Sequence, residues 1–169
     1  VSHDRGKRWS EYLDVFDGTS RSVIHFEQSI VQLDDGRLLA IAWAFEAASG
    51  RTLPTPYAVS NDGRHFSSPQ LTGLHGQTAK LLAIGGQHVL CVYRRHDKPG
   101  LWAQLARLDS DRWVNLFELL LWQGTGTARQ FQNTSDQLSG LKFGYPSLVC
   151  TAPDEVTVVF WCEEGGLHN

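Results

Sequence analysis

The 169-residue chain contains no methionine, and it has only three cysteines and six prolines. No apolar run approaches the roughly 20 residues that a membrane-spanning helix needs, and no signal peptide is visible, so the sequence predicts no membrane span. Because methionine is missing, no start codon is represented. We therefore expect the chain to be a fragment of a longer protein, which leaves its cellular location unknown.

The few cysteines do not predict a disulfide. All three fall in predicted strands, and pairing the last hairpin about a turn at 153–154 places Cys162 opposite Pro146, not opposite Cys150. Free, buried thiols are the interpretation that this register favours, for Cys91 as well. No Cys/His spacing resembles a zinc site, and we expect neither a metal nor a cofactor.

Basic clusters are also missing. The chain has 15 Lys and Arg against 18 Asp and Glu, a formal net charge of −3. This balance argues against nucleic acid or an anionic membrane surface as a partner. The composition is otherwise ordinary for a globular protein, and the length suffices for a domain with a real core.

A 16-residue pattern occurs three times, at 28–43, 79–94 and 146–161. Each copy is a short apolar run, a turn rich in Asp, Gly or Pro, and a second apolar run, which is typical of a β-hairpin. A repeat at a spacing of roughly 50 residues indicates one supersecondary unit used several times. In an all-β chain this favours a β-propeller.

We therefore predict an all-β propeller whose blades cover residues 1 to about 22, 23–75, 76–125 and 143–169, with a long linker before the last. A complete blade has four antiparallel strands. The two complete blades are predicted to contain these strands: Gln28–Leu33, Leu38–Phe45, Pro56–Ser60 and a short strand after Phe66, then Lys80–Ile84, His88–Arg94, Leu101–Leu108 and Val114–Leu121.

The turns between third and fourth strands carry a second motif. Ser2–Trp9 has the form S-x-D-x-G-x-x-W, 60–66 is one residue shorter, and 109–113 keeps only a degenerate form ending in Trp. Ser and Asp side chains accept hydrogen bonds from the turn backbone, Gly supplies a positive φ, and the aromatic residue is expected to plug the blade. The motif is structural, so its aspartates are not candidates for catalysis.

This motif resembles the Asp-box, or BNR, repeat of sialidases and sialidase-like proteins. The resemblance implies a six-bladed propeller, of which this chain is roughly the last three blades, so that the rest of the propeller is missing. It implies a glycan substrate, and sialidase-like proteins are often exported. Asp-boxes also occur in propellers that are not sialidases, so the fold does not settle the function.

The order of strands predicts where a site lies. The 1–2 and 3–4 turns share one rim of a four-stranded blade, so the 2–3 loops and the connections between blades lie on the opposite rim. Several polar and aromatic residues are expected there. The residues just before the first strands are Glu27, Thr78 and Tyr145, and those just after the second strands are Trp43, Arg94 and Trp161. The 2–3 loops add Glu46, Arg51, Arg95, His96 and Asp97, and the linker adds Arg129, Phe131 and Asn133.

The resemblance to retaining sialidases assigns roles to these positions. Tyr145 lies where the nucleophilic tyrosine is expected, and Glu27 lies two blades earlier, where a glutamate polarises it. Arg51, Arg94 and Arg95 lie on loops that carry arginines for the substrate carboxylate, and Trp43 and Asp97 are expected to contact substrate. The general acid and the first arginine fall in the missing blades. The predicted function is exo-hydrolysis of terminal sialic-acid-type sugars.

Other interpretations of the same residues stay open. Tyr145 can be a strand-end aromatic residue with a hydrogen-bonded hydroxyl. Arg94 and Arg95 can be solvated or paired with Asp97 and Glu46, and the tryptophans can pack between blades. The rival function is a non-catalytic glycan-binding or assembly propeller.

Overall fold

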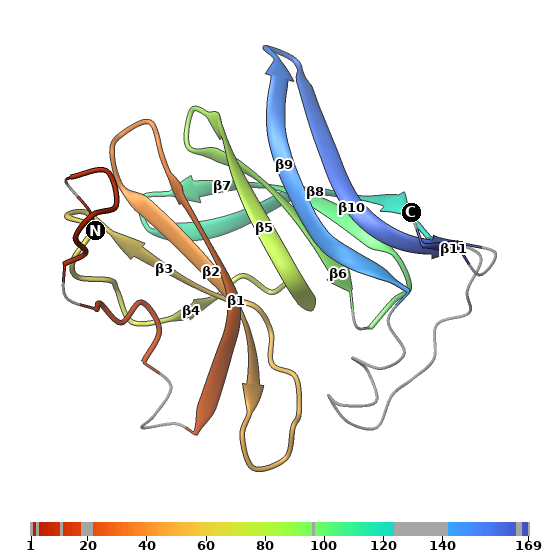
Figure 1. The fold of residues 1–169 in the computed structure, drawn as a ribbon, viewed down its shortest axis with the longest axis horizontal. Coiled ribbons are helices and arrows are strands. Elements are labelled where there is room, and N and C mark those ends of the chain that lie inside the picture. The colour runs from red at the N-terminus through yellow and green to blue at the C-terminus, as the bar shows by residue number, and fades with distance from the viewer. Residues whose placement is uncertain are drawn as a thin grey trace.

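The computed structural model describes residues 2, 4–10, 12–17, 22–95, 97–123, 142–164 and 167–168. Within these residues every regular element is a β-strand, and the strands form three antiparallel sheets (Figure 1). The prediction of an all-β fold is therefore confirmed. His96, Arg129, Phe131 and Asn133 lie outside the described residues.

The strands pair with their neighbours in the sequence. The first sheet has the order β1 (Val23–Gln32), β2 (Leu38–Glu46), β3 (Pro56–Ser60) and β4 (Gln70–Leu71). The second has the order β5 (Gly76–Gly85), β6 (His88–Arg95), β7 (Leu101–Asp109) and β8 (Arg112–Trp122). The third contains β9 (Phe143–Ala152), β10 (Glu155–Glu164) and β11 (Leu167–His168), with β10 in the middle.

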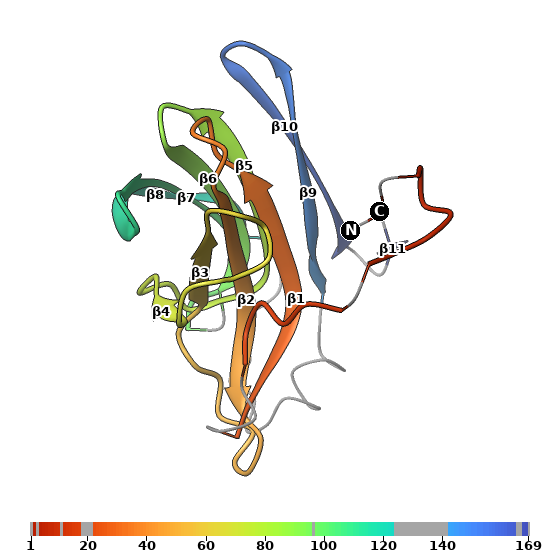
Figure 2. The same ribbon diagram turned by 90° about the vertical axis from the view of Figure 1, so that its left-hand side faces the viewer.

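The three sheets stack through their faces (Figures 1 and 2). Strand β5 contacts both β1 and β9 and lies between them in Figure 1. Alternate side chains of a strand point to opposite faces, and β6 uses both of its faces. Val89, Cys91 and Tyr93 join a core shared with the first sheet, whereas Leu90 and Val92 pack toward the third sheet. A middle sheet with two apolar faces therefore holds its neighbours on either side.

Residues before β1 contribute no strand within the described positions. Phe16 is buried against Ala40, Ala42 and Ala58 on one face of the first sheet, and Val15 lies beside it. The N-terminal segment was predicted to be the outer end of a blade. In the structure its described residues Val15 and Phe16 cover part of one face of the first sheet with apolar side chains.

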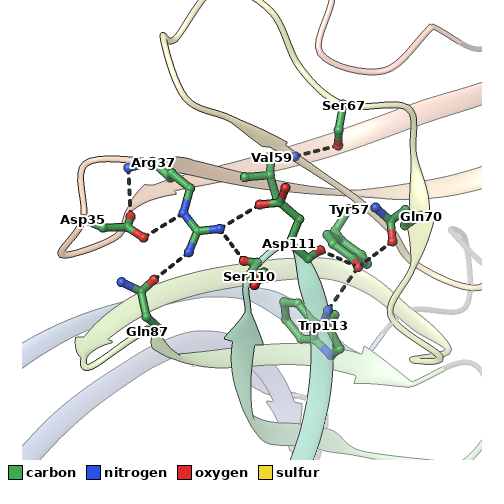
Figure 3. A network of polar contacts seen from close by, with 10 residues as sticks. All are labelled: Asp35, Arg37, Tyr57, Val59, Ser67, Gln70, Gln87, Ser110, Asp111 and Trp113. Carbon is green, nitrogen blue, oxygen red and sulfur yellow. Dashed lines mark hydrogen bonds and ion pairs between the residues drawn. The ribbon is translucent and has the colours of Figure 1, made fainter.

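A polar network joins turns of the first and second sheets (Figure 3). Arg37, after the β1–β2 turn, forms ion pairs of 2.7 Å with Asp35 and with Asp111 of the β7–β8 turn. Its guanidinium also donates to the Ser110 carbonyl and, at 3.1 Å, to Gln87 in the β5–β6 turn. These three turns therefore lie at one end of the sheets, as the strand-order argument predicts.

Tyr57 anchors the same network from inside the core, and its removal has a predictable cost. Its hydroxyl accepts from the Trp113 N–H at 3.0 Å and lies 2.9 Å from the Asp111 carbonyl oxygen. We expect Tyr57→Phe to lower the free energy of unfolding by about 1–3 kcal/mol, because a buried N–H loses its acceptor. Urea unfolding measures this, with the exposed Tyr12→Phe as a control. An unchanged midpoint for Tyr57→Phe would contradict the assignment.

The turns of the S-x-D-x-G motif have the predicted hydrogen bonds. Asp4 accepts from the Arg8 N–H at 2.8 Å, and the Ser2 hydroxyl accepts from the Gly6 N–H at 2.7 Å. In the second turn Asp62 accepts from two backbone N–H groups at 2.8 Å. The side-chain bond from His65 and these backbone bonds lower the pKa of Asp62. The turn mechanics inferred from the sequence are confirmed.

The aromatic ends of these turns differ from one another. Trp113 is buried in the core, and Phe66 packs on the first sheet. Trp9 is 75% exposed, so the prediction that it plugs a blade is wrong within the described residues. Residues 2, 4–10 and 12–17 contain a turn and bends but no strand, so Trp9 has no strand of its own segment to pack against among the described residues.

The cysteine register also needs correction. Cys162 lies opposite Phe143, not opposite Pro146. Counting from the Glu155–Ala152 pair next to the turn gives Tyr145, one residue from the predicted Pro146, and two register shifts that each add a residue to β9 account for the remaining two positions. Cys91 is buried, and burial raises the pKa of its thiol. Cys150 is exposed, so the expectation of a buried thiol is wrong at that position.

Candidate functional site

Three equivalent β-bulges mark the candidate site. Glu27, Thr78 and Tyr145 have φ angles of 51°, 51° and 52°, in the left-handed region that non-glycine residues seldom adopt. Each lies at a register shift between a first strand and its hairpin partner. Such strained conformations cost about 1–3 kcal/mol each and persist where the surroundings hold them, often at functional sites. The equivalence of these positions, inferred from the repeat, is thus seen in the backbone.

Their predicted place relative to the strands was wrong. Glu27, Thr78 and Tyr145 lie inside β1, β5 and β9, not before them, and Trp43, Arg94 and Trp161 lie inside the partner strands. A bulge places two residues opposite one, and pairing then resumes. Phe26, for example, still pairs with Trp43 beyond the bulge. In the first sheet the repeated sequence pattern begins just after the bulge, at Gln28, whereas strand β1 already begins at Val23, before the bulge.

The bulges lie away from the network of turns. Ser60 pairs with Leu38 at the start of β2, so the Asp62 turn shares an end of the first sheet with the β1–β2 turn. Phe26 pairs with Trp43 five residues further along β2, and Glu27 therefore lies toward the opposite end. The separation of Asp62 from Glu27 agrees with the strand-order argument.

We call Glu27, Gln77, Thr78, Lys80, Arg94 and Tyr145 the inner-strand cluster. Its members come from the neighbouring strands β1, β5, β6 and β9. The Thr78 backbone donates a hydrogen bond to the Glu27 carboxylate, and the Lys80 ammonium lies 4.6 Å from the centroid of the Tyr145 ring. The cluster therefore spans all three sheets.

Arg94 is the buried centre of the cluster. Only 4% of the residue is exposed. Its guanidinium donates to Gln77 Oε1 at 2.8 and 3.2 Å and to the Phe143 carbonyl at 3.2 Å. Burial lowers the pKa of Arg94 to about 10, and the negative charge of Glu27 opposes that shift. Arg94 thus ties the second sheet to the third by a charged hydrogen bond.

Gly144 makes room for this arrangement. Its φ is 154°, and a Cβ built there would lie 2.7 Å from Arg94 Nη1. That distance is well inside van der Waals contact, and Arg94 is held too tightly to move aside without losing its hydrogen bonds. The glycine beside the candidate nucleophile is therefore explained by the close approach of the guanidinium.

Glu27 is half-buried beside two cations. Burial raises the pKa of Glu27 above its ordinary value of 4.5, and the charges of Arg94 and Lys80 and the Thr78 hydrogen bond act against this rise. Its Oε2 atom is buried and has no hydrogen-bond partner among the described residues. One carboxylate oxygen is thus available to accept a proton or a ligand hydrogen bond.

The raised pKa of Glu27 predicts a pH dependence of stability. The folded state holds this proton more tightly than the unfolded state, so the contribution of the proton to stability is fully present below the unfolded pKa. It is lost as pH rises from about 4.5 through the raised folded value. We expect Glu27→Gln to gain in free energy of unfolding, relative to wild type, across that interval. Denaturant unfolding of both proteins between pH 4 and 8 measures the difference. A difference independent of pH would contradict it.

The other predicted ligands of an acidic substrate have partners within the protein. Arg51 is paired with Glu46 and is largely exposed. Arg95 forms ion pairs with Asp97, at 2.7 Å, and with Glu118, at 2.6 Å. The pairing of Arg95 with Asp97, one of the alternatives that the sequence left open, is therefore observed.

The two tryptophans differ. Trp43 is 4% exposed and packs with Phe26 and Phe45, with ring centroids 5.7 Å apart in both pairs. Trp161 is 37% exposed. Trp43 is therefore a packing residue of the first sheet in this structure, and Trp161 is the more accessible of the two.

Sequence reasoning missed three members or neighbours of the cluster: Gln77, Lys80 and Gly144. The repeat contained a signal for Lys80. It lies two residues after Thr78, where the other copies have Ser29 and Ser147. A lysine at a position occupied elsewhere by serine is an exchange that an alignment of the three copies would have revealed.

Some kinds of site are not found in the described part of the chain. No group of three or more His, Cys, Asp or Glu side chains there is placed to hold a metal ion. Among the same residues no helix is long and apolar enough to cross a membrane.

Comparison with known proteins supports the fold alone. No protein-family model matches the chain, and no curated protein sequence matches it either. The chain is similar in structure to a crystal structure of a protein of unknown function from Dyadobacter fermentans DSM 18053, with a TM-score of 0.73 and 22% identity. The match covers 99% of this chain and 42% of that one, so the chain spans less than half the length of that protein.

Proposed function

We propose that the protein is a sialidase-like glycoside hydrolase that removes terminal sialic-acid-type sugars from glycans, with Tyr145 as nucleophile and Glu27 as its base. In this proposal the three sheets are blades of a six-bladed β-propeller. The observation that carries the proposal is the set of equivalent strained bulges. In support of it, Glu27 of β1 and Tyr145 of β9 occupy equivalent bulges, and the third equivalent bulge, Thr78, is on β5 between these two strands.

The chemistry follows from the two side chains. A phenol is a weak nucleophile until a neighbouring base takes its proton. In the proposed step the Tyr145 oxygen bonds to the anomeric carbon and its proton passes to Glu27. The bond to the leaving group breaks as the general acid, which the proposal assigns to the part of the propeller outside this chain, protonates the leaving oxygen. In the second step water attacks the anomeric carbon and gives its proton to that acid, while the departing Tyr145 oxygen takes its proton back from Glu27. The sugar is released with retained configuration. A neutral phenol also avoids the repulsion that a carboxylate nucleophile would meet from an anionic sugar.

The rival candidate is a non-catalytic glycan-binding or assembly protein with the same fold. The ion pairs of Arg51 with Glu46 and of Arg95 with Asp97 and Glu118 favour it, because these arginines are already neutralised. Under this alternative the inner-strand cluster binds a sugar and leaves its glycosidic bond intact.

One experiment separates the two. The protein is incubated with chromogenic glycosides of acidic and neutral sugars, and the anomeric configuration of the first-formed product is read by NMR. Hydrolysis of the acidic glycoside with retention supports the enzyme. Binding of acidic glycans without turnover supports the rival, and hydrolysis with inversion contradicts a tyrosine nucleophile.

A further inference from the structure

The cations at this end of the sheets differ in how they are engaged. Arg51 and Arg95 each face a carboxylate of this chain. Arg94 is buried, with its guanidinium turned to Gln77 and to the Phe143 carbonyl. Each of the three arginines is therefore neutralised or enclosed by the protein, and forming a contact with a ligand would require breaking an existing one.

Lys80 is different. It is half-buried on β5, two residues beyond the Thr78 bulge. In the described part of the chain its ammonium forms no ion pair or hydrogen bond. It lies over the face of the Tyr145 ring, 4.6 Å from the centroid, and its charge also acts on Glu27 and lowers the pKa of that carboxyl group. Tyr145 as a whole residue is 54% exposed. A cation on the face of an exposed ring is held weakly, so a ligand anion can compete for it.

We propose that Lys80 binds the carboxylate of the acidic sugar and thereby sets substrate specificity, an inference that rests on the proposed function. The position fits this role because the ammonium lies beside Tyr145, the candidate nucleophile, and near enough to Glu27 to act on its charge. A sugar carboxylate held by Lys80 lies within reach of both groups. Lysine is a point charge with three donors, whereas arginine offers a planar fork.

The test compares Lys80→Met and Lys80→Arg with a matched control. Lys98→Met is suitable because Lys98 also lies over an aromatic ring, 5.7 Å from the centroid of Trp102. The readouts are kcat and KM for an acidic chromogenic glycoside and for its neutral counterpart, and calorimetric binding of free N-acetylneuraminic acid. A thermal melt of each variant checks folding.

We expect Lys80→Met to raise KM and Kd for the acidic sugar about tenfold or more, with kcat changed less than about threefold, because a charged hydrogen bond is lost. Lys80→Arg should stay within about threefold of wild type, since it keeps the charge. For the neutral glycoside, Lys80→Met should leave KM unchanged, because that sugar has no carboxylate to bind. Lys98→Met should leave the constants for both glycosides unchanged. The wild-type preference for the acidic sugar should weaken at high salt.

The outcomes separate this inference from the proposed function. Hydrolysis by wild type with an unchanged KM in Lys80→Met overturns the role of Lys80 and leaves the enzyme intact. If wild type binds acidic sugars without hydrolysing them and Lys80→Met no longer binds them, the role of Lys80 is supported and the proposed hydrolase activity is overturned. If wild type neither binds nor hydrolyses acidic sugars, both are overturned. If Lys80→Met does not fold, the affinity of wild type and of Lys80→Arg for the acidic sugar is measured at low and high salt instead. An affinity that does not vary with salt overturns carboxylate binding by Lys80.

Discussion

Tyr145→Phe is expected to lower kcat on an activated acidic glycoside by about 10³-fold or more, because it removes the oxygen that attacks the sugar. The fold should survive, since the residue is 54% exposed and only its hydroxyl oxygen is lost. Glu27→Gln should lower kcat by about 10²–10⁴-fold, because an amide cannot accept the phenolic proton. The double variant should be little worse than Tyr145→Phe, since the two residues act on one step.

The exposed Tyr12→Phe serves as the control for loss of a tyrosine hydroxyl. Each variant is assayed for release of the chromogenic leaving group at saturating substrate. Unchanged turnover in Tyr145→Phe would rule out its role as nucleophile. Fully additive losses in the double variant would show that Glu27 acts on a different step from Tyr145.

Arg94→Met is expected to lower the free energy of unfolding by about 3–5 kcal/mol, the range for breaking a buried charged contact. The substitution keeps an extended side chain but leaves Gln77 Oε1 and the Phe143 carbonyl without their donor. It also removes the positive charge that acts on half-buried Glu27. Because Arg94 joins the second and third sheets, the loss should weaken their packing.

Guanidinium chloride unfolding measures this loss, with Arg51→Met as the matched control. The side chain of Arg51 is 65% exposed, and its ion pair with Glu46 should contribute only about 0–1 kcal/mol. Equal effects of the two substitutions would show that Arg94 is not a structural tie between the sheets. A large effect of Arg94→Met alone would confirm that tie.

The hairpins could be predicted because their signals are local. Apolar runs on both sides of an Asp-Gly or Gly-Gly turn specify the β1–β2 and β5–β6 hairpins, and the predicted and observed limits of Pro56–Ser60 agree. The bulges could not be predicted. Nothing in the residues around Glu27 requires a positive φ, and only the resumed pairing of Phe26 with Trp43 reveals that β1 continues through it.

Local order therefore came from the sequence: three repeated hairpins, an all-β chain, and turns in which Ser and Asp bind the backbone a few residues away. Hydrogen bonds of that kind join residues close in the chain, so a short sequence motif is enough to predict them. The partners of Arg94 and Lys80 were decided only by the stacking of the sheets, whereas pairs such as Arg95 with Asp97 join residues close in the chain. Arg94 meets the Phe143 carbonyl 49 residues away, and Lys80 meets Tyr145 across two sheets. Burial and charge pairing depend on which faces meet, because both are properties of neighbours in space.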